Sequence, residues 1–136
     1  MPILSVIIPT HERFRYAKET VAAILRMHEG IELIVSDTSV VDPWASFAPH
    51  PRLKVVRPGP GISVVDNFNT ALSHATGDYV CFIGDDDLIA PEIVDIACKA
   101  KSLGVDAVRF TFPIIFYWKD YLHRSDPDAY SGTIWI

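Results

Sequence analysis

Residues 77–87 read Gly-Asp-Tyr-Val-Cys-Phe-Ile-Gly-Asp-Asp-Asp, and this stretch is the most informative part of the chain. The apolar, β-favouring run 79–83 is typical of a buried strand, and it is followed by a glycine and three consecutive carboxylates. Two carboxylates about 5 Å apart repel by about 3 kcal/mol at an effective dielectric constant of about 20. Magnesium relieves such repulsion by combining one or two carboxylates with substrate phosphates. The stretch therefore predicts a metal–phosphate site at the carboxyl end of a strand, with a solvated acidic turn as the alternative.

The composition is that of a globular protein. The chain has 136 residues, of which 49% are hydrophobic and 21% charged, and its formal net charge is −5. This length predicts one domain. The negative charge argues against nucleic acid as a partner, because no basic face would neutralise the phosphates. Since no apolar run reaches about 18 residues and no N-terminal signal is present, we expect no transmembrane segment. A cytoplasmic location is predicted, and a place at the membrane surface stays open.

Strand-like and helix-like segments alternate along the chain. Strands are predicted over residues 3–8, 31–35, 53–56, 79–83 and 107–112, and helices over 14–28, 63–75 and 91–103. Continuous apolar strands alternating with helices predict an α/β fold, with a mostly parallel sheet and helices on both of its faces.

Polar residues follow three of the predicted strands. They are residues 9–13 after the first strand, Asp37 after the second and residues 85–87 after the fourth. Ligands of open α/β sheets bind beyond the carboxyl ends of the strands, so these groups are expected to meet in one crevice. Taken singly, Asp37 could cap a turn, and His11 and Arg13 could be solvated loop residues. Their joint placement favours a binding site.

Three stretches carry a resemblance to a known family. They are residues 5–13 (Ser-Val-Ile-Ile-Pro-Thr-His-Glu-Arg), 34–39 (Ile-Val-Ser-Asp-Thr-Ser) and 77–91. In this order they resemble the nucleotide-sugar-binding half of a family 2 glycosyltransferase, and the resemblance covers about residues 3–118. It implies the GT-A fold, which is Rossmann-like. The family usually has an aromatic residue and Asn where this chain has His11 and Glu12, and two acids before a glycine where it has residues 36–38.

The resemblance implies a site for a nucleotide-diphosphate sugar, with a uridine preference. Its implied nucleotide-binding residues are Pro9, Thr10, His11, Glu12, Arg13, Asp37, Asn67, Asn69, Asp85 and Asp86. Asp37 matches the acid that accepts from the N3–H of uracil, and His11 takes the place of the aromatic residue that packs on the base. For Asn67 and Asn69 a solvent-facing helix position is the alternative.

The resemblance also implies a divalent metal, Mg²⁺ or Mn²⁺, held against the diphosphate. The family's metal motif is Asp-x-Asp, and aligned through residues 88–91 its first Asp falls on Gly84 and its second on Asp86. Asp86 is the implied metal ligand, and Asp87 supports it or caps a turn. Because Gly84 replaces the first acid, the ribose contact would pass to Asp85, as in some relatives.

The acceptor side is expected to be incomplete. Residues 1–118 are predicted to form the nucleotide-sugar-binding domain, and residues 119–136 the start of a truncated acceptor-side region or a tail. Inverting members of the family need a general base well after the metal motif, and no motif for one is present in this chain. Transfer of a sugar with inversion to a glycan, lipid or protein acceptor is the implied function. A non-catalytic nucleotide-binding module and a phosphorylatable receiver-type domain are the alternatives, and homo-oligomerisation stays open.

Overall fold

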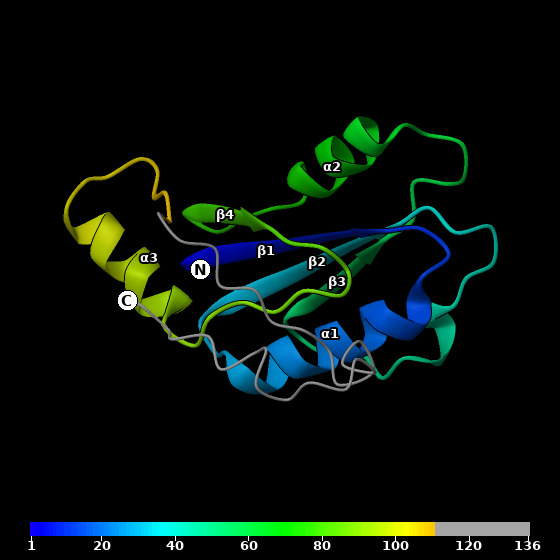
Figure 1. Cartoon of the computed structure of the whole chain (residues 1–136), viewed down its shortest axis with the longest axis horizontal. Helices are drawn as coiled ribbons and strands as arrows, with labels where there is room; N and C mark the ends of the chain where they lie inside the picture. The colour runs from blue at the N-terminus through cyan, green and yellow to red at the C-terminus, as the bar shows by residue number, and fades with distance from the viewer. Residues whose placement is uncertain (111–136) are drawn as a thin grey trace, which may run out of the picture.

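The computed structural model describes residues 1–110, and its centre is a four-stranded parallel sheet (Figure 1). The elements in chain order are β1 (Leu4–Thr10), α1 (Phe14–Met27), β2 (Ile31–Asp37), the 3-10 helix η1 (Trp44–Ser46), β3 (Leu53–Val56), α2 (Val64–Leu72), β4 (Tyr79–Phe82) and α3 (Ile93–Ser102). The strand order is β3-β2-β1-β4. The chain therefore steps outward from β1 to β3 and then returns to the other side of β1. This reversal places a crevice at the carboxyl ends of β1 and β4.

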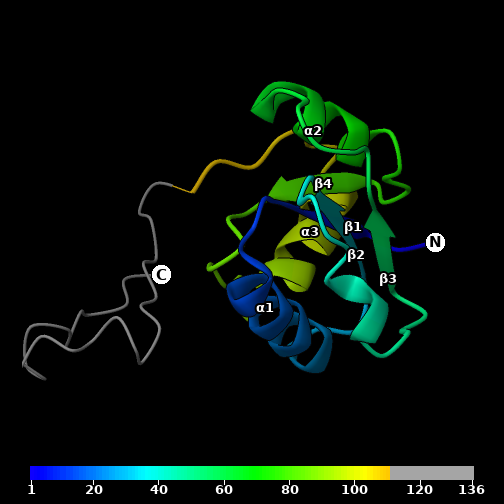
Figure 2. The same ribbon diagram turned by 90° about the vertical axis from the view of Figure 1, so that its right-hand side faces the viewer.

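Helices cover both faces of the sheet, as the sequence predicts. Val6 and Ile8 of β1 pack with α1 and α3, whereas Ile7 between them packs with Ile34 and with Ala71 of α2. Successive strand residues point to opposite faces, so a continuous apolar strand has to be covered on both sides. Figure 2 shows α2 on one side of the sheet and α1 with α3 on the other. The predicted α/β fold class is confirmed.

A hydrogen-bond network fixes the start of β4 against β1 and β2. The Oε1 atom of Glu32 accepts from Ser5 Oγ at 2.6 Å, from Thr76 Oγ1 at 2.9 Å and from the Gly77 amide at 3.1 Å. Burial alone would raise the pKa of Glu32, but these hydrogen bonds outweigh it and lower that pKa. The network holds the strand that leads to the three aspartates.

Several predicted elements differ from the structure in their bounds: β1 and β2 continue to Thr10 and Asp37, and α3 begins at Ile93 and not at residue 91. The helix expected over 63–75 begins at Val64, because Ser63 is its N-terminal cap: Ser63 Oγ accepts from the Asp66 amide at 3.0 Å. The helix ends at Leu72. The strand expected over 107–112 is wrong for residues 107–110, which form no ladder with any strand of the described chain. Residues 111–112, like the predicted region 119–136, lie outside the described residues.

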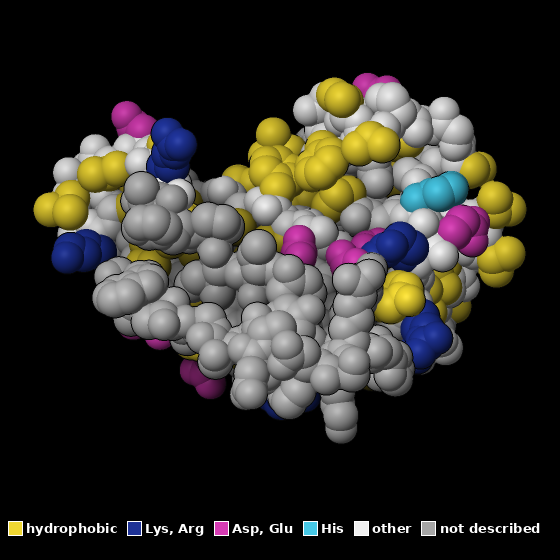
Figure 3. All heavy atoms as spheres, in the orientation of Figure 1, with side chains coloured by type: hydrophobic (Ala, Val, Ile, Leu, Met, Phe, Trp, Pro, Cys, Tyr) yellow, Lys and Arg dark blue, Asp and Glu magenta, His cyan; other side chains and the backbone are white. Residues whose placement is uncertain are grey.

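β4 is an edge strand, and two apolar side chains on one of its faces are partly exposed. It pairs with β1 on one side, and within residues 1–110 no strand pairs with its other side. Val80 and Phe82 are 38% and 44% exposed. Phe82 contacts Phe68 of α2, with 5.2 Å between ring centroids. Hydrophobic side chains gather over this part of the surface in Figure 3.

Candidate functional site

A cleft of about 510 Å³ lies at the carboxyl ends of β1 and β4. Its walls come from four segments: Pro9, Thr10, His11 and Arg13; Thr38; Gly61, Ile62, Ser63, Val64 and Asn67; Gly84 and Asp85. The structure thus brings together residues that follow three of the predicted strands. The loop before α2 was not predicted as part of the site, although the run Pro58-Gly-Pro-Gly61 marks a turn that leads the chain back toward the sheet.

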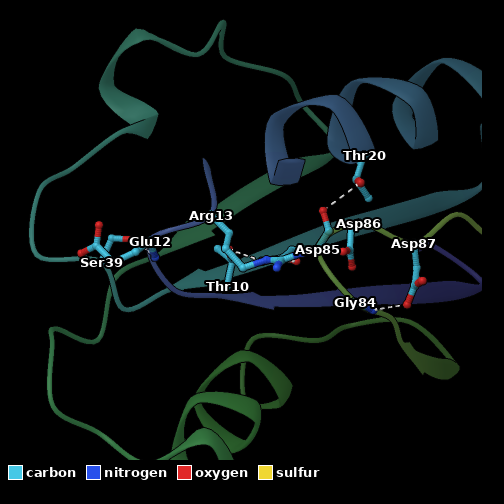
Figure 4. A network of polar contacts seen from close by, with 9 residues as sticks. All are labelled: Thr10, Glu12, Arg13, Thr20, Ser39, Gly84, Asp85, Asp86 and Asp87. Atoms are coloured by element: carbon cyan, nitrogen blue, oxygen red, sulfur yellow. Dashed lines mark hydrogen bonds and ion pairs between the residues drawn. The ribbon is translucent and has the colours of Figure 1, made fainter. Parts of the chain in front are cut away.

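The loop between β1 and α1 is fixed by Glu12 (Figure 4). Glu12 has a φ of 54°, in the left-handed region that side chains with a Cβ rarely adopt. Its amide donates to Ser39 Oγ at 2.7 Å, and its Oε1 accepts from the Val40 amide at 2.8 Å. Asn tolerates this conformation better than most residues, which gives a physical reason for the Asn that the family usually has here. Glu12 therefore ties the β1 loop to the segment after β2.

His11 is held at the rim of the cleft. Its Nδ1 lies 3.1 Å from the carbonyl oxygen of Thr38 and 3.0 Å from Thr38 Oγ1, within hydrogen-bond distance of both. The Thr38 amide donates in turn to the carbonyl of Thr10 at 3.1 Å. The imidazole is exposed and lines the cleft beside Pro9, where a flat ligand group could pack on it.

Asp85 is buried and fully engaged by protein groups. Its Oδ2 accepts from Thr10 Oγ1 at 2.7 Å, and Arg13 Nε lies 2.8 Å and 3.1 Å from its two carboxylate oxygens. Its carbonyl oxygen accepts from Thr20 Oγ1 at 2.9 Å. The hydrogen bond to Asp85 raises the pKa of Arg13, which stays a cation. Asp85 thus fixes a guanidinium at the cleft wall (Figure 4).

Asp86 and Asp87 differ in their surroundings. Asp86 is paired with Arg13 Nη2, and its side chain is 29% exposed. Asp87 Oδ2 accepts from the Gly84 amide at 3.0 Å, which closes a turn over residues 84–87. The turn-capping alternative for Asp87 is thus what the hydrogen bond supports. No group of three or more His, Cys, Asp or Glu side chains in the described part of the chain is placed to hold a metal ion.

Asp37 lies at the end of β2 but is wholly buried, at 0% exposure. Its Oδ1 accepts from the Ser39 amide at 2.7 Å, and its Oδ2 accepts from Trp44 Nε1 at 2.7 Å. Trp44 packs edge-on against Phe14 and Phe47, with ring centroids 4.9 Å and 5.4 Å apart. Both oxygens of Asp37 are therefore occupied in this conformation, and Asp37 does not line the cleft.

The two asparagines of α2 are placed differently. Asn67 lines the cleft and is 6% exposed, with Nδ2 donating to the carbonyl of Ser36 at 3.1 Å. Its Oδ1 is buried and has no hydrogen-bond partner within residues 1–110. Asn69 is exposed and does not line the cleft. Of this predicted pair, only Asn67 is brought to the site.

Similar proteins place this geometry in a family. The family described as "Glycosyl transferase family 2" matches residues 5–128. "Uncharacterized protein y4gI" of Sinorhizobium fredii is 29% identical over an alignment of 117 residues, and the match covers 79% of this chain and 13% of that protein. The solved structure "Crystal structure of S. aureus TarS 1-349" has a TM-score of 0.58 and 25% sequence identity, and the match covers 75% of this chain and 33% of that one. The chain thus spans a minor part of both proteins.

No helix among the described residues is long and apolar enough to cross a membrane. The four-stranded parallel sheet, the cleft at the ends of β1 and β4, and the family match agree with one another. They favour the predicted GT-A architecture over the receiver-type alternative. The match spans most of the chain, and so the chain belongs to glycosyl transferase family 2.

Proposed function

We propose that this chain is the donor-binding part of a glycosyltransferase. It would bind a nucleotide-diphosphate sugar, with UDP as the nucleotide, in the cleft at the carboxyl ends of β1 and β4. The sugar would pass with inversion to an acceptor whose site lies largely outside the described residues. The observation that carries this proposal is the placement of Thr10, Arg13 and Asp85 in one cleft at the point where the strand order reverses.

The residues present fit a divalent ion that arrives with the diphosphate. Asp86 offers a partly exposed carboxylate, and oxygen is the ligand that Mg²⁺ and Mn²⁺ take. The described residues do not form a cage of several protein ligands. Magnesium is commonly held by one or two carboxylates and by substrate phosphates, so one accessible aspartate is sufficient. When bound, the ion would neutralise charge on the diphosphate.

The chain's own residues would bind and orient the donor. Thr10, His11 and Thr38 line one wall of the cleft, and the first turn of α2 with Asn67 lines the other. The amides at the start of a helix carry partial positive charge and favour an anionic group such as a phosphate. Arg13 adds a fixed cation on the same wall as Asp85. Orientation of this kind lowers the barrier to transfer by holding the anomeric carbon in place for the acceptor.

Recognition of the uracil base involves Asp37 in this proposal. Asp37 is the proposed acceptor for the N3–H of uracil, but both of its oxygens are engaged. Because Asp37 is also wholly buried, contact with the base requires a local rearrangement that exposes one of its oxygens. The rim formed by Pro9 and His11 needs no such change, because it already lines the cleft.

Nucleotide titration with and without metal tests the proposal. Calorimetric titration of UDP, CDP, GDP and ADP, each with and without Mn²⁺, should show binding that needs Mn²⁺ and is tightest for UDP. Asp86→Asn should weaken UDP binding in Mn²⁺ about tenfold or more while the fold is kept, because a ligand charge is lost. Asp95→Asn, at an exposed position in the first turn of α3, is the matched control. Equal binding by Asp86→Asn and the parent would refute the metal assignment.

Transfer itself needs a separate experiment. Incubation with a panel of UDP-sugars, Mn²⁺ and glycan, lipid and protein acceptors should release free sugar slowly and form little glycosylated product. General base catalysis contributes about 10²- to 10⁴-fold, and the described residues contain no base motif for it. Rapid turnover to a defined acceptor would show that the chain supplies its own acceptor site.

A further inference from the structure

Arg13 lies where two carboxylates of the cleft converge. Its Nε is 2.8 Å from Asp85 Oδ1, and its Nη2 is paired with Asp86 Oδ2. One guanidinium thus pairs with both acids, and it lies at the wall of the same cleft (Figure 4). Arg13 is at the cap position of α1, but its side chain makes no capping hydrogen bond. The side chain is therefore not required for the helix to begin.

The two ends of this guanidinium are held unequally. Asp85 is 9% exposed and is fixed by Thr10 as well as by Arg13. Asp86 is 29% exposed and Arg13 is 44% exposed, so their pair is open to water. Exposed ion pairs contribute little stability and exchange readily, whereas a buried hydrogen-bonded carboxylate does not. The contact with Asp86 is the one that can be given up.

We infer that Arg13 is a built-in cation that competes with the divalent metal for Asp86. In the absence of nucleotide the guanidinium satisfies Asp86, and binding of a metal requires it to release this carboxylate while it keeps Asp85. This inference rests on the proposed function, because it takes Asp86 as the metal-facing acid. It assigns to Arg13 a control over when the metal binds.

The charges explain why such a competitor would be useful. Asp85, Asp86 and Arg13 together carry one net negative charge, which repels a free diphosphate. A dication that arrives without nucleotide is repelled by the guanidinium that is already paired with Asp86. A diphosphate that carries its own metal can satisfy both: its ion faces Asp86, and its phosphate oxygens accept from the released guanidinium, whose fork suits phosphate. The arrangement therefore favours the metal–nucleotide complex over either component alone.

Substitution of Arg13 should have opposite effects on the two ligands. Arg13→Gln should bind Mn²⁺ alone about tenfold more tightly than the parent, because a positive charge is removed next to the ion. The same variant should bind UDP in saturating Mn²⁺ several-fold more weakly, because the phosphate loses a guanidinium donor. A purely structural role for Arg13 would weaken both.

Mn²⁺ binding is measured by electron paramagnetic resonance of the free ion and by the rise in melting temperature that Mn²⁺ produces, and UDP binding by calorimetry. Arg13→Lys keeps the charge without the fork, so its affinity for Mn²⁺ alone should stay low. Arg26→Gln removes an equal charge at the exposed far end of α1 and should leave both affinities unchanged.

The outcomes separate this inference from the proposed function. If the parent binds UDP with Mn²⁺ but Arg13→Gln binds Mn²⁺ alone no better than the parent, the competition is refuted and the function stands. An Arg13→Gln protein whose melting temperature does not respond to Mn²⁺ refutes the competition in the same way. If the parent fails to bind UDP in Mn²⁺, the proposed function itself is wrong.

Discussion

The indole Nε1 of Trp44 donates to Asp37 Oδ2 at 2.7 Å, and this bond joins the end of β2 to the 3-10 helix that follows it. Both residues are buried, at 6% and 0% exposure. A buried carboxylate is costly unless each oxygen has a donor, and here the Ser39 amide supplies the second. The aromatic residue in the long connection thus stabilises the acid at the strand end.

Trp44→Phe should lower the free energy of unfolding by about 1–3 kcal/mol, because a buried acceptor loses its donor. Urea denaturation measures the change. The same substitution made in an Asp37→Ala background should cost less, since the acceptor is already gone, and the difference gives the coupling between the two side chains. Equal costs in both backgrounds would mean that the hydrogen bond contributes nothing.

Asp37→Ala should reduce the preference for UDP over CDP, GDP and ADP, because the base would lose its acceptor. Trp44→Phe provides the matched test, because it frees Asp37 Oδ2 without removing the carboxylate. If Asp37 contacts the base, the preference for UDP should persist or increase in Trp44→Phe. Competition titrations in Mn²⁺ measure it. The assignment fails if Asp37→Ala discriminates as well as the parent.

Gly77→Ala should destabilise the fold by about 2 kcal/mol or more, as overpacking against rigid groups does. A Cβ at this position would lie 2.6 Å from the backbone nitrogen of Ser5 and 2.8 Å from the carbonyl carbon of Leu4, and backbone cannot move aside cheaply. Gly30→Ala is the control, because its Cβ would approach a side chain, Val94 Cγ1, at 3.2 Å. The melting temperature of Gly77→Ala should be well below that of Gly30→Ala.

The stability of Glu12 variants should depend on how well the new residue adopts a positive φ, and not on its polarity. Glu12→Asn should be close to neutral, because Asn adopts positive φ readily and this gain offsets the lost bond to the Val40 amide. Glu12→Val should cost about 1–3 kcal/mol, since a β-branched residue is strained there. Chemical denaturation of both variants tests the order, and the conformational account is wrong if Val is tolerated as well as Asn.

Stability should fall in two steps as the pH is lowered. Burial lowers the pKa of His28 from its ordinary value of 6.5, so below that pH the unfolded chain binds a proton that the folded chain resists. The pKa of Glu32 is also lowered, from 4.5, so its contribution is complete above pH 4.5 and is lost as the pH falls through the folded-state value. Unfolding measured at about pH 7.5, 5.5 and 3 should show both steps. His28→Gln should flatten the first step and Glu32→Gln the second.

Much of the fold could be predicted from the sequence because its signals are local. The apolar strands before Pro9, Asp37 and Gly84 and the helical spacing of residues 14–28 correspond to β1, β2, β4 and α1. The strand predicted at 107–112 could not be judged in this way, because an apolar run becomes a strand only where another strand pairs with it. Pairing is a tertiary property that periodicity does not contain.

The location of the site could be predicted from the sequence, but its hydrogen bonds could not. That residues 9–13 and 85–87 meet follows from parallel topology. The hydrogen-bond partners of the acids do not follow from topology. Asp85 accepts from Thr10 and Asp87 accepts from the Gly84 amide of its own turn, and these contacts depend on the folded backbone. Likewise, the aromatic residues in the loop after β2 gave no sign that Trp44 would donate to Asp37.

The side of β4 that no strand within residues 1–110 pairs with has a consequence for handling the protein in solution. An edge strand with unpaired amides and carbonyls is a template for a strand of another molecule, and Val80 and Phe82 add an apolar surface beside it. Self-association of the protein should therefore depend on whether this edge is covered. A piece cut to residues 1–110 should show light scattering that rises with concentration. Val80→Lys should suppress this rise, because a lysine on an edge strand disfavours sheet extension without entering the core.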